Sequence, residues 1–372
     1  MLELMQKLGY KPRFAVWELT LRCNLNCRHC GSRAGKARDD ELTHDEALRV
    51  CRELAELGCE RLTLSGGEPL LRHDWADIAR TLVELGVHTS MISNGSLWNE
   101  EIGRTMKAVG LCGLGISVDG FRDTHDHQRR RPGHWDQVVK TIRDAAAMGI
   151  YVTAVTTVTR RNLGELAELR DCMGELGASF HQFQFATPTG NMAEHRDLML
   201  KPEDVLTAVP LIARLCADHK KPTVHSTHNI GYFGEPEDLL RKSDVVVPFW
   251  TGCTAGMSAI GIESNGNVKG CLSLPSELNG QDAFVEGNLR KASLREIWDR
   301  PGAFAYNREF TLESLGGFCR SCDYAEVCRG GCTWSCHANH GFVRDNPYCY
   351  HRQLTLCQLR ASSAPPKKKG TG

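Results

Sequence analysis

Short apolar runs alternate with longer amphipathic runs from Phe14 to about Leu200, and this alternation constrains the fold more than any other feature. Such a repeat of predicted strands and helices is typical of parallel βα units. The predicted strands are Phe14–Thr20, Arg61–Ser65, Thr89–Ser93, Leu114–Asp119, Tyr151–Thr157 and Phe180–Ala186. Six units predict an α/β fold, a partial (β/α)6 barrel similar to a TIM barrel, whose functional residues lie at the carboxyl ends of the strands.

The first predicted helix has clear signals at both ends. Thr43 is followed three residues later by Glu46, which is the spacing of a capping box. Gly58 can end the same helix after one continuous apolar face.

The composition of the remaining chain predicts further segments. Residues 1–13 form an N-terminal segment before the barrel at 14–200, and residues 201–250, which contain several prolines and a predicted helix at Val205–Leu215, form a bridge. Residues 251–357 contain many cysteines and few long helical patterns, as expected of a small domain that metal clusters hold together. Residues 358–372 resemble a disordered basic tail.

Charge and hydropathy exclude several classes of function. The chain has 45 basic and 45 acidic residues, so no net charge attracts nucleic acid or an anionic membrane. No apolar run reaches the length of a membrane-spanning helix, and the N-terminus lacks a secretory signal, so we expect a cytoplasmic protein. Because disulfides are rare in that compartment, the 17 cysteines indicate metal or redox chemistry.

Three of these cysteines, Cys23, Cys27 and Cys30, follow the first predicted strand with the spacing CxxxCxxC. Three thiolates can bind three irons of a [4Fe–4S] cube and leave the fourth iron open, whereas a structural cluster normally has four cysteines. A structural zinc site or scattered core cysteines are the alternatives, but zinc motifs usually pair two cysteines with a second ligand pair.

A second motif, Ser65-Gly-Gly-Glu-Pro69, follows the second predicted strand. Gly66 and Gly67 let the backbone approach a ligand closely and expose peptide groups to it, and Glu68 adds a carboxylate beside it. Together with the cysteine trio, this run resembles the radical S-adenosylmethionine (AdoMet) superfamily over the whole barrel. The resemblance implies that AdoMet binds the open iron through its amino and carboxylate groups, and that the Gly66–Pro69 strand end binds the amino group.

The resemblance also implies further contacts with AdoMet or substrate at later strand ends. The implied residues are Ser93 and Asn94 after the third strand, Ser117 and Asp119 after the fourth, and Arg129 in a run similar to HDxxR. The arginine would pair with the AdoMet carboxylate, which suits a guanidinium fork. His29 replaces the aromatic residue that often precedes the third cysteine, so its role stays open.

The cysteines of the C-terminal region resemble the seven-cysteine SPASM extension of radical AdoMet enzymes. Its pattern is C-x9–15-G-x4-C, then C-x2-C-x5-C-x3-C, then C, and it is matched by Cys253, Gly266, Cys271, Cys319, Cys322, Cys328, Cys332 and Cys349. The resemblance implies two auxiliary iron–sulfur clusters of the [4Fe–4S] type. One would use Cys319, Cys322, Cys328 and Cys349, and the other Cys253, Cys271 and Cys332. Cys336 is our candidate for the fourth ligand of the second set; an open iron there is the alternative.

These resemblances imply reductive cleavage of AdoMet to a 5′-deoxyadenosyl radical, which takes a hydrogen atom from the substrate. Oxidation or cross-linking of a ribosomally made peptide is the expected reaction, as in the pyrroloquinoline quinone and mycofactocin maturases. About a dozen residues precede the first strand, so a separate leader-binding protein is expected beside the precursor peptide, with flavodoxin or ferredoxin as reductant.

Two other functions are weighed against a peptide maturase. Modification of tetrapyrrole side chains in a haem or haem d1 pathway is the first, because Arg129–Arg131 would suit carboxylate-rich substrates. A non-catalytic iron–sulfur electron carrier is the second. The Gly66–Pro69 run, Ser117 and Asp119 argue against a carrier, which needs no AdoMet site.

Overall fold

A computed structural model describes residues 9–241, 249–278, 281–341 and 344–363. One mixed sheet forms its centre, with the strand order β12-β9-β8-β1-β2-β3-β4-β5-β6-β7. Neighbouring strands from β8 through β1 to β7 are parallel, whereas β9 and β12 are antiparallel to their neighbours. The strands of this sheet are β1 Phe14–Glu18, β2 Arg61–Ser65, β3 His88–Ser93, β4 Gly113–Ser117, β5 Val152–Val158, β6 Phe180–Phe185, β7 Thr223–Ser226, β8 Ala259–Ile262, β9 Asn267–Lys269 and β12 Gly287–Asn288.

All six predicted strands are present, which confirms the partial βα barrel. The sheet extends further than predicted at both edges. Strand β7 lies within the segment expected to be a bridge and pairs with β6. Strand β8 comes from the cysteine-rich region and pairs with β1, with Trp17 opposite Ile262. The two parts of the chain therefore share one sheet, which places the second set of cysteines beside the barrel.

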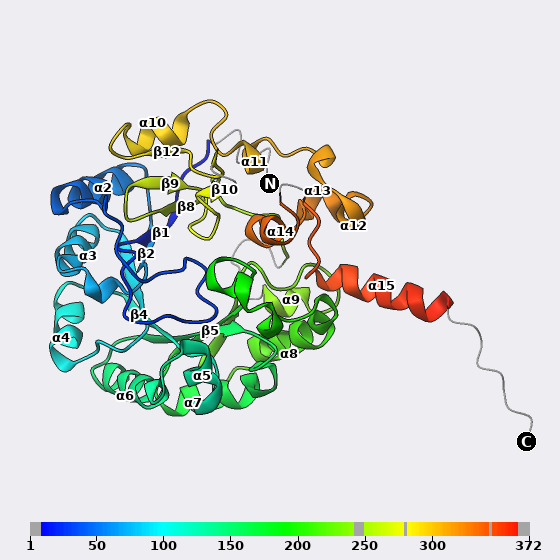
Figure 1. Ribbon diagram of the computed structural model, residues 1–372, viewed down its shortest axis with the longest axis horizontal. Helices are drawn as coiled ribbons and strands as arrows, with labels where there is room; N and C mark the ends of the chain where they lie inside the picture. The colour runs from blue at the N-terminus through cyan, green and yellow to red at the C-terminus, as the bar shows by residue number, and fades with distance from the viewer. Residues whose placement is uncertain (1–8, 242–248, 279–280, 342–343, 364–372) are drawn as a thin grey trace, which may run out of the picture.

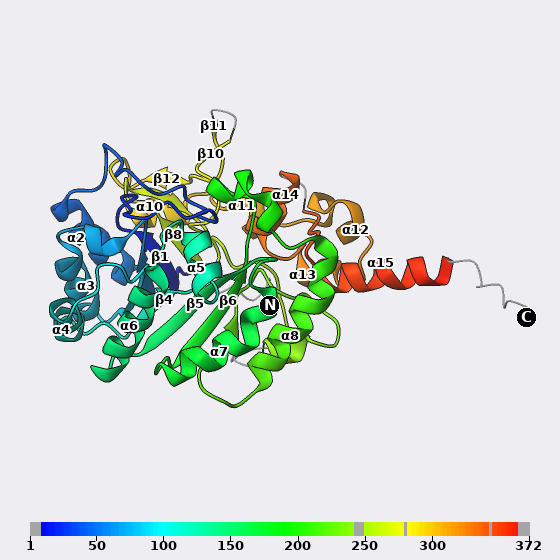
Figure 2. The same cartoon turned by 60° about the horizontal axis from the view of Figure 1, so that its bottom comes forward.

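Helices cover the outer face of the sheet (Figures 1 and 2). They are α2 His44–Glu56, α3 Trp75–Glu84, α4 Glu100–Ala108, α5 Arg122–Arg129, α6 His134–Ala147, α7 Leu166–Glu175 and α8 Val205–Ala217. The predicted capping box of α2 is confirmed: the Glu46 N–H donates to Thr43 Oγ1 (3.4 Å) and the Thr43 N–H to Glu46 Oε2 (2.8 Å).

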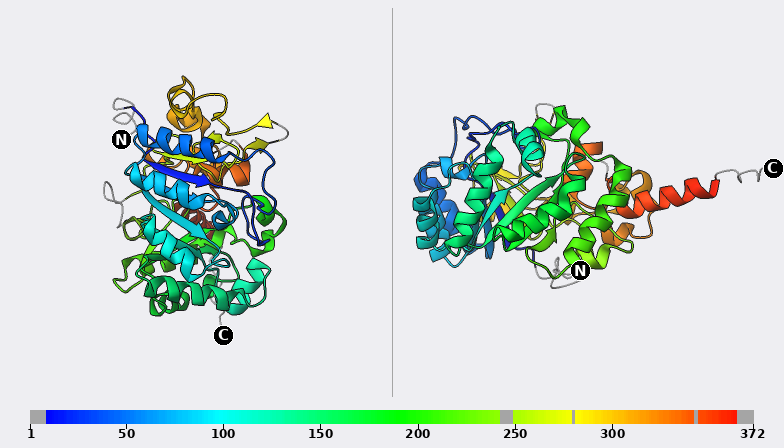
Figure 3. Two further views of the ribbon diagram at one scale, coloured as in Figure 1. Left: turned by 90° about the vertical axis from the view of Figure 1, so that its left-hand side faces the viewer. Right: turned by 90° about the horizontal axis from the view of Figure 1, so that it is seen from below.

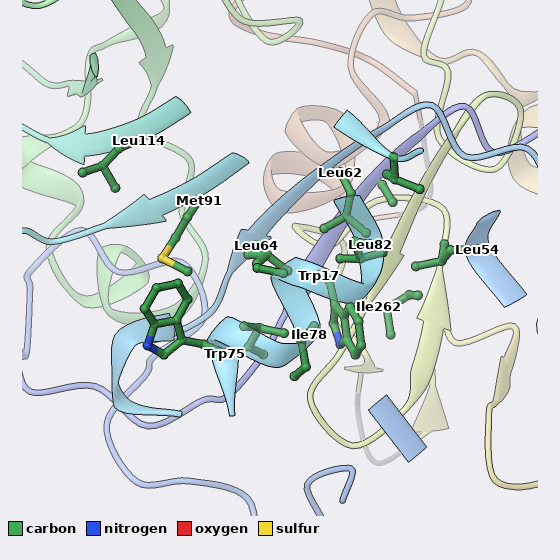
Figure 4. Packing of buried hydrophobic residues seen from close by; sticks show 14 of the residues in the cluster. Trp17, Leu54, Leu62, Leu64, Trp75, Ile78, Leu82, Met91, Leu114 and Ile262 are labelled. Atoms are coloured by element: carbon green, nitrogen blue, oxygen red, sulfur yellow. The ribbon is translucent and has the colours of Figure 1, made fainter. Parts of the chain in front are cut away.

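The main core lies between the sheet and these helices. Leu62 and Leu64 extend from β2 toward Ile78 and Leu82 of α3, with Trp17 of β1 beside them (Figure 4). None of the five side chains is more than 1% exposed. Because truncation of such a residue removes apolar burial and leaves a cavity, each contributes about 2–5 kcal/mol to stability.

Short helices and loops dominate the region after β12. They are α10 Leu294–Asp299, α11 Ala305–Arg308, α12 Gly317–Arg320, α13 Ala325–Cys328, α14 Thr333–His340 and the longer α15 Tyr350–Ser363. Helix α15 projects from the body of the molecule (Figure 3). None of the helices within the described ranges is both long and apolar enough to cross a membrane.

Helix α15 corrects the predicted start of the disordered tail. Residues 358–363 continue this helix, and residues 364–372 lie outside the described part of the chain. Leu354 packs against the cluster of buried residues around α8 and anchors the helix. Good helix formers such as Gln358, Leu359 and Arg360 then extend it, because adding a residue to an existing helix costs little.

Candidate active site and the accessory cysteine groups

The first three cysteines lie in the loop that follows β1. The Cys23 N–H donates to the Gly35 carbonyl (2.9 Å) and closes the loop. Asn191, which follows β6, donates from its side chain to the Cys27 carbonyl and from its N–H to the Cys30 carbonyl, both at 2.8 Å. The chain's own hydrogen bonds therefore hold the loop from two sides.

The thiols of this loop suit a polynuclear cluster. Burial raises the pKa of Cys27 to about 11 and also raises that of Cys23, so metal loading must release protons. Among the described residues, no group of three or more His, Cys, Asp or Glu side chains converges on a site for one ion. Each thiolate of an iron–sulfur cube binds a different iron, so three thiols on one loop suit three irons of a cube.

Gly66 and Gly67 pack directly against the base of the cysteine loop. A Cβ atom on Gly66 would lie 2.4 Å from the Thr20 carbonyl oxygen, and one on Gly67 would lie 2.3 Å from that of Arg22. The Gly67 N–H donates to Thr20 and the Glu68 N–H to Arg22, both at 2.8 Å. The backbone that these glycines approach is therefore the chain's own, and the pair fixes the start of the cysteine loop.

Glu68 is fully buried and links the ends of β2 and β3. Its carboxylate accepts from Ser93 Oγ (2.9 Å), the Asn94 N–H (2.8 Å) and the Leu70 N–H (3.2 Å). Burial raises the pKa of Glu68 to about 7, although these hydrogen bonds favour the ionised form. Pro69, also buried, begins a short 3-10 turn after it. A cationic ligand group near Glu68 would favour its ionised form.

Asn94 connects this carboxylate to the cysteine loop. Its side-chain NH2 group donates to Asn24 Oδ1 (2.8 Å) and lies 4.0 Å from Cys23 Sγ. Ser93 and Asn94, predicted from sequence to contact the cofactor, are thus brought beside Glu68 and Cys23.

A second buried network surrounds Asp119, just after β4. Arg129 Nε donates to Asp119 Oδ2 (2.6 Å), and Arg129 Nη1 lies 3.7 Å from Cys27 Sγ. His29 Nε2 lies 3.3 Å from the same carboxylate oxygen. Burial opposes ionisation of Asp119, but Arg129 and His29 outweigh it and lower its pKa to about 2. Ser117 is half-buried at the end of β4.

His29 is neutral at physiological pH, because burial lowers its pKa to about 4 against the opposing effect of Asp119. Its contact with Asp119, at 3.3 Å, therefore joins a neutral ring and a carboxylate. The resemblance left the role of this histidine open, and the structure places it against the carboxylate that accepts from Arg129.

A cavity of about 590 Å³ opens beside this network. Its lining contains four arginines and no acidic residue: Cys23, Asn24, Leu25, Asn26, Arg33, Ala34, Gly35, Arg129, Arg130 and Arg131. Arg129 is neutralised by Asp119, and Arg33 forms an ion pair with Glu194. The cavity therefore combines a thiol of the first motif with a positively charged wall.

Four cysteines of the second set gather around another cavity. Cys319, Cys322, Cys328 and Cys349 line it together with aromatic residues. Burial raises the pKa of each thiol, and for Cys328 the other three raise it further. These are the four that the resemblance assigns to one auxiliary cluster.

The remaining cysteines form a neighbouring group. Burial raises the pKa of Cys332, and Cys253 and Cys271 raise it further. Cys336 lies in the first turn of α14, four residues after Cys332, is 2% exposed and donates to the Gly330 carbonyl (2.9 Å). Its environment includes thiols of both groups, so it lies between the two predicted clusters.

Tyr232 connects the two accessory groups and was not identified from sequence. Its hydroxyl accepts from the Cys332 N–H (3.0 Å) and donates to the His228 carbonyl (2.6 Å), while its own carbonyl lies 3.7 Å from Cys349 Sγ. Neither Tyr232 nor Asn191 belongs to a motif, and both act through backbone groups distant in sequence. No pattern in a single sequence could have identified them.

The fold and the site define an enzyme that holds an open iron–sulfur cluster and AdoMet at the carboxyl ends of a parallel barrel. Family comparisons agree: the chain matches the radical SAM superfamily over residues 17–173 and the iron–sulfur cluster-binding SPASM domain over residues 253–323. The chain belongs to the radical SAM superfamily and carries a C-terminal SPASM domain. AdoMet and [4Fe–4S] clusters are the cofactors of this class.

Individual relatives cover most of the chain. An AdoMet-dependent heme synthase of Methanosarcina barkeri is 32% identical over 352 residues, which are 92% of this chain and 97% of the relative. Mycofactocin maturase MftC of Mycobacterium tuberculosis is 26% identical, over 86% of this chain and 78% of its own. The structure of Streptococcus suis SuiB bound to S-adenosylmethionine shares the fold, with a TM-score of 0.71, 16% identity and coverage of 91% of this chain and 76% of SuiB.

Proposed function

We propose that this radical SAM enzyme modifies the carboxylate-bearing side chains of an iron tetrapyrrole. The observation that carries this proposal is the cavity beside Cys23, whose charged residues are all arginines. Propionate side chains are the anionic groups of tetrapyrroles, and guanidinium groups bind carboxylates with two parallel hydrogen bonds. The similarity to a heme synthase along almost the whole chain supports the same substrate class.

The cofactors would be held by the residues at the strand ends. Cys23, Cys27 and Cys30 would bind the open cluster; AdoMet would contact the segment from Gly66 to Pro69 and the strand ends at Ser93, Asn94, Ser117, Asp119 and Arg129. When bound, the cluster and AdoMet together supply a 5′-deoxyadenosyl radical that removes a hydrogen atom from the substrate. The chain's own task is to orient the substrate and exclude water.

The reaction we propose is conversion of a propionate side chain to a vinyl group, with loss of its carboxylate. It releases CO2, one hydrogen atom and one electron from the side chain. The hydrogen atom passes to the AdoMet-derived acceptor, and the electron passes to a one-electron acceptor of the iron–sulfur type. The iron–sulfur clusters that we propose at the two accessory cysteine groups are our candidates for this electron acceptor. Cys336 would be the fourth ligand in the group that contains Cys332. A flavodoxin or ferredoxin would supply the electron that starts the reaction.

Peptide maturation is the second candidate, favoured by the similarity to a mycofactocin maturase over most of the chain. In that case the substrate would be a precursor peptide, presented by a separate leader-binding protein. The arginine-lined wall would then contact acidic residues of the peptide.

Anaerobic reconstitution followed by product analysis separates these functions. With AdoMet and dithionite, we expect 5′-deoxyadenosine, and with iron coproporphyrin III, which carries four propionates, a product that has lost CO2 and two hydrogens from the propionic acid form. Turnover of a precursor peptide but not of the porphyrin would establish the second candidate. An iron-loaded protein that forms no 5′-deoxyadenosine would be an electron carrier.

A further inference from the structure

Two arginines that directly follow α5 give the cavity wall positive charge outside any ion pair of the described residues. Arg130 is exposed and Arg131 half-buried, and both line the cavity with Cys23. Within the described ranges, neither forms an ion pair, in contrast to Arg129 and Arg33. Glu194, the partner of Arg33, is near enough for the charge of Arg130 to help lower its pKa, but it is at ion-pair distance from Arg33 alone.

The acidic residue nearest in sequence is already occupied. The two carboxylate oxygens of Asp126 accept from the Gly133 N–H (2.6 Å) and the Trp135 N–H (2.8 Å), which ties down the turn between α5 and α6. The Arg131 N–H donates to the Asp126 carbonyl (3.1 Å). These bonds fix the backbone of the two arginines. The carboxylate of Asp126 is used in the turn and does not pair with either guanidinium group.

The backbone of Arg130 supplies an independent observation. This residue caps the C-terminus of α5 with φ of 55°, in the left-handed region where helix ends usually have glycine. Arg33, on the other side of the same cavity, has φ of 50°. A side chain in this region costs stability that glycine would not cost, and such residues concentrate at functional sites. The conformation places a charged side chain at this cavity where folding alone would favour glycine.

We propose that Arg130 and Arg131 form a carboxylate-binding site that holds two propionate groups of the substrate at the mouth of the cavity. This proposal rests on the proposed function and identifies the residues that select its substrate. Two cations on adjacent residues match a ligand with two carboxylates, and the guanidinium fork gives each contact a direction. Arg129, buried against Asp119, stays available to the interior of the site.

Substitution Arg130→Gly tests the proposal because folding and binding should respond differently. Glycine is favoured at a left-handed helix end, so the melting temperature should stay the same or rise. Loss of one charge-assisted contact should weaken binding of iron coproporphyrin III to the reconstituted enzyme by about tenfold, measured by anaerobic titration of the porphyrin absorption band. Arg131→Gln should have a similar effect on binding.

The uncharged tetramethyl ester of the same porphyrin provides the ligand control, and Arg52→Ala, an exposed arginine on α2, provides the matched protein control. Wild-type enzyme should bind the free acid more tightly than the ester, and that preference should weaken with added salt. Arg130→Gly should lose the preference, whereas Arg52→Ala should keep it.

Unchanged affinity of Arg130→Gly and Arg131→Gln for the free acid, or an equal loss for acid and ester, would overturn the proposed carboxylate site. Wild-type enzyme without preference for the acid would overturn it as well. Failure of the proposed function has another signature: the arginine variants lose the preference for the acid, but wild-type enzyme forms no vinyl product.

Discussion

Replacement of Gly67 by alanine should displace the cysteine loop. The new Cβ atom would lie 2.3 Å from the Arg22 carbonyl oxygen, so the two segments must separate by at least about 0.7 Å to reach the 3.0 Å below which such contacts essentially do not occur. This overpacking costs about 1–3 kcal/mol. The hydrogen bonds from Gly67 to Thr20 and from Glu68 to Arg22 would stretch as well, at about 1 kcal/mol each. We therefore expect a total loss of about 3–5 kcal/mol.

Thermal unfolding and iron analysis of reconstituted protein would measure the effect. Gly67→Ala should lower the melting temperature and the iron bound by the first motif, whereas the accessory clusters should keep their iron. Gly35→Ala is the matched control, because Gly35 lies in the same loop and a Cβ atom there has no neighbour within 4 Å. If Gly67→Ala matched Gly35→Ala in stability and iron content, the role assigned to the close packing would be wrong.

Three other substitutions or titrations test the site. Asp119→Asn leaves the buried Arg129 without its counter-charge and should cost about 3–5 kcal/mol in thermal or denaturant unfolding; a loss below 1 kcal/mol would show that the pair is not important for stability. The pKa of Glu68 is about 7 in the folded protein and 4.5 for an ordinary glutamate. Between these two pH values the folded protein therefore holds a proton on Glu68 that the unfolded chain has lost. Cofactor-free protein should therefore lose about 3 kcal/mol as pH rises through this window, and Glu68→Gln should abolish that slope in pH-dependent unfolding. Cys336→Ala should lower the iron content of one accessory cluster, while unchanged iron and an unchanged absorption spectrum would exclude Cys336 as a ligand.

The sequence predicted the barrel because each strand has its own local signal. Each strand appears in the sequence as a short run rich in apolar residues, and the structure confirms all six. Strand β8 was not predicted, because a run of only four residues, Ala259–Ile262, is too short to identify a strand from its pattern. Its place is determined by pairing with β1, about 240 residues earlier in the chain, and such long-range pairing leaves no pattern in one sequence.

The site was predictable where its chemistry depends on spacing. The cysteine trio and the Gly66–Pro69 run are local motifs, and the structure brings Glu68, Ser93 and Asn94 together as their strand ends suggested. Partners that act through the backbone were not predictable. Asn191 holds the cysteine loop from more than 160 residues away, and only the fold shows that contact.

The charged residues in the interior of the site balance one another, whereas in the part of the chain that the structure describes the two arginines at the mouth of the cavity form no ion pair, and burial explains the difference. Inside, Asp119 neutralises Arg129, and Glu68 is held near its ionisation point, so the interior adds little net charge until a cationic group arrives. At the mouth, Arg130 and Arg131 have no acidic partner among the described residues. Since buried charges need partners and exposed ones do not, the interior is suited to a ligand with both a cation and a carboxylate, such as AdoMet. The mouth is suited to an anion, and the substrate should therefore be the more acidic of the two ligands.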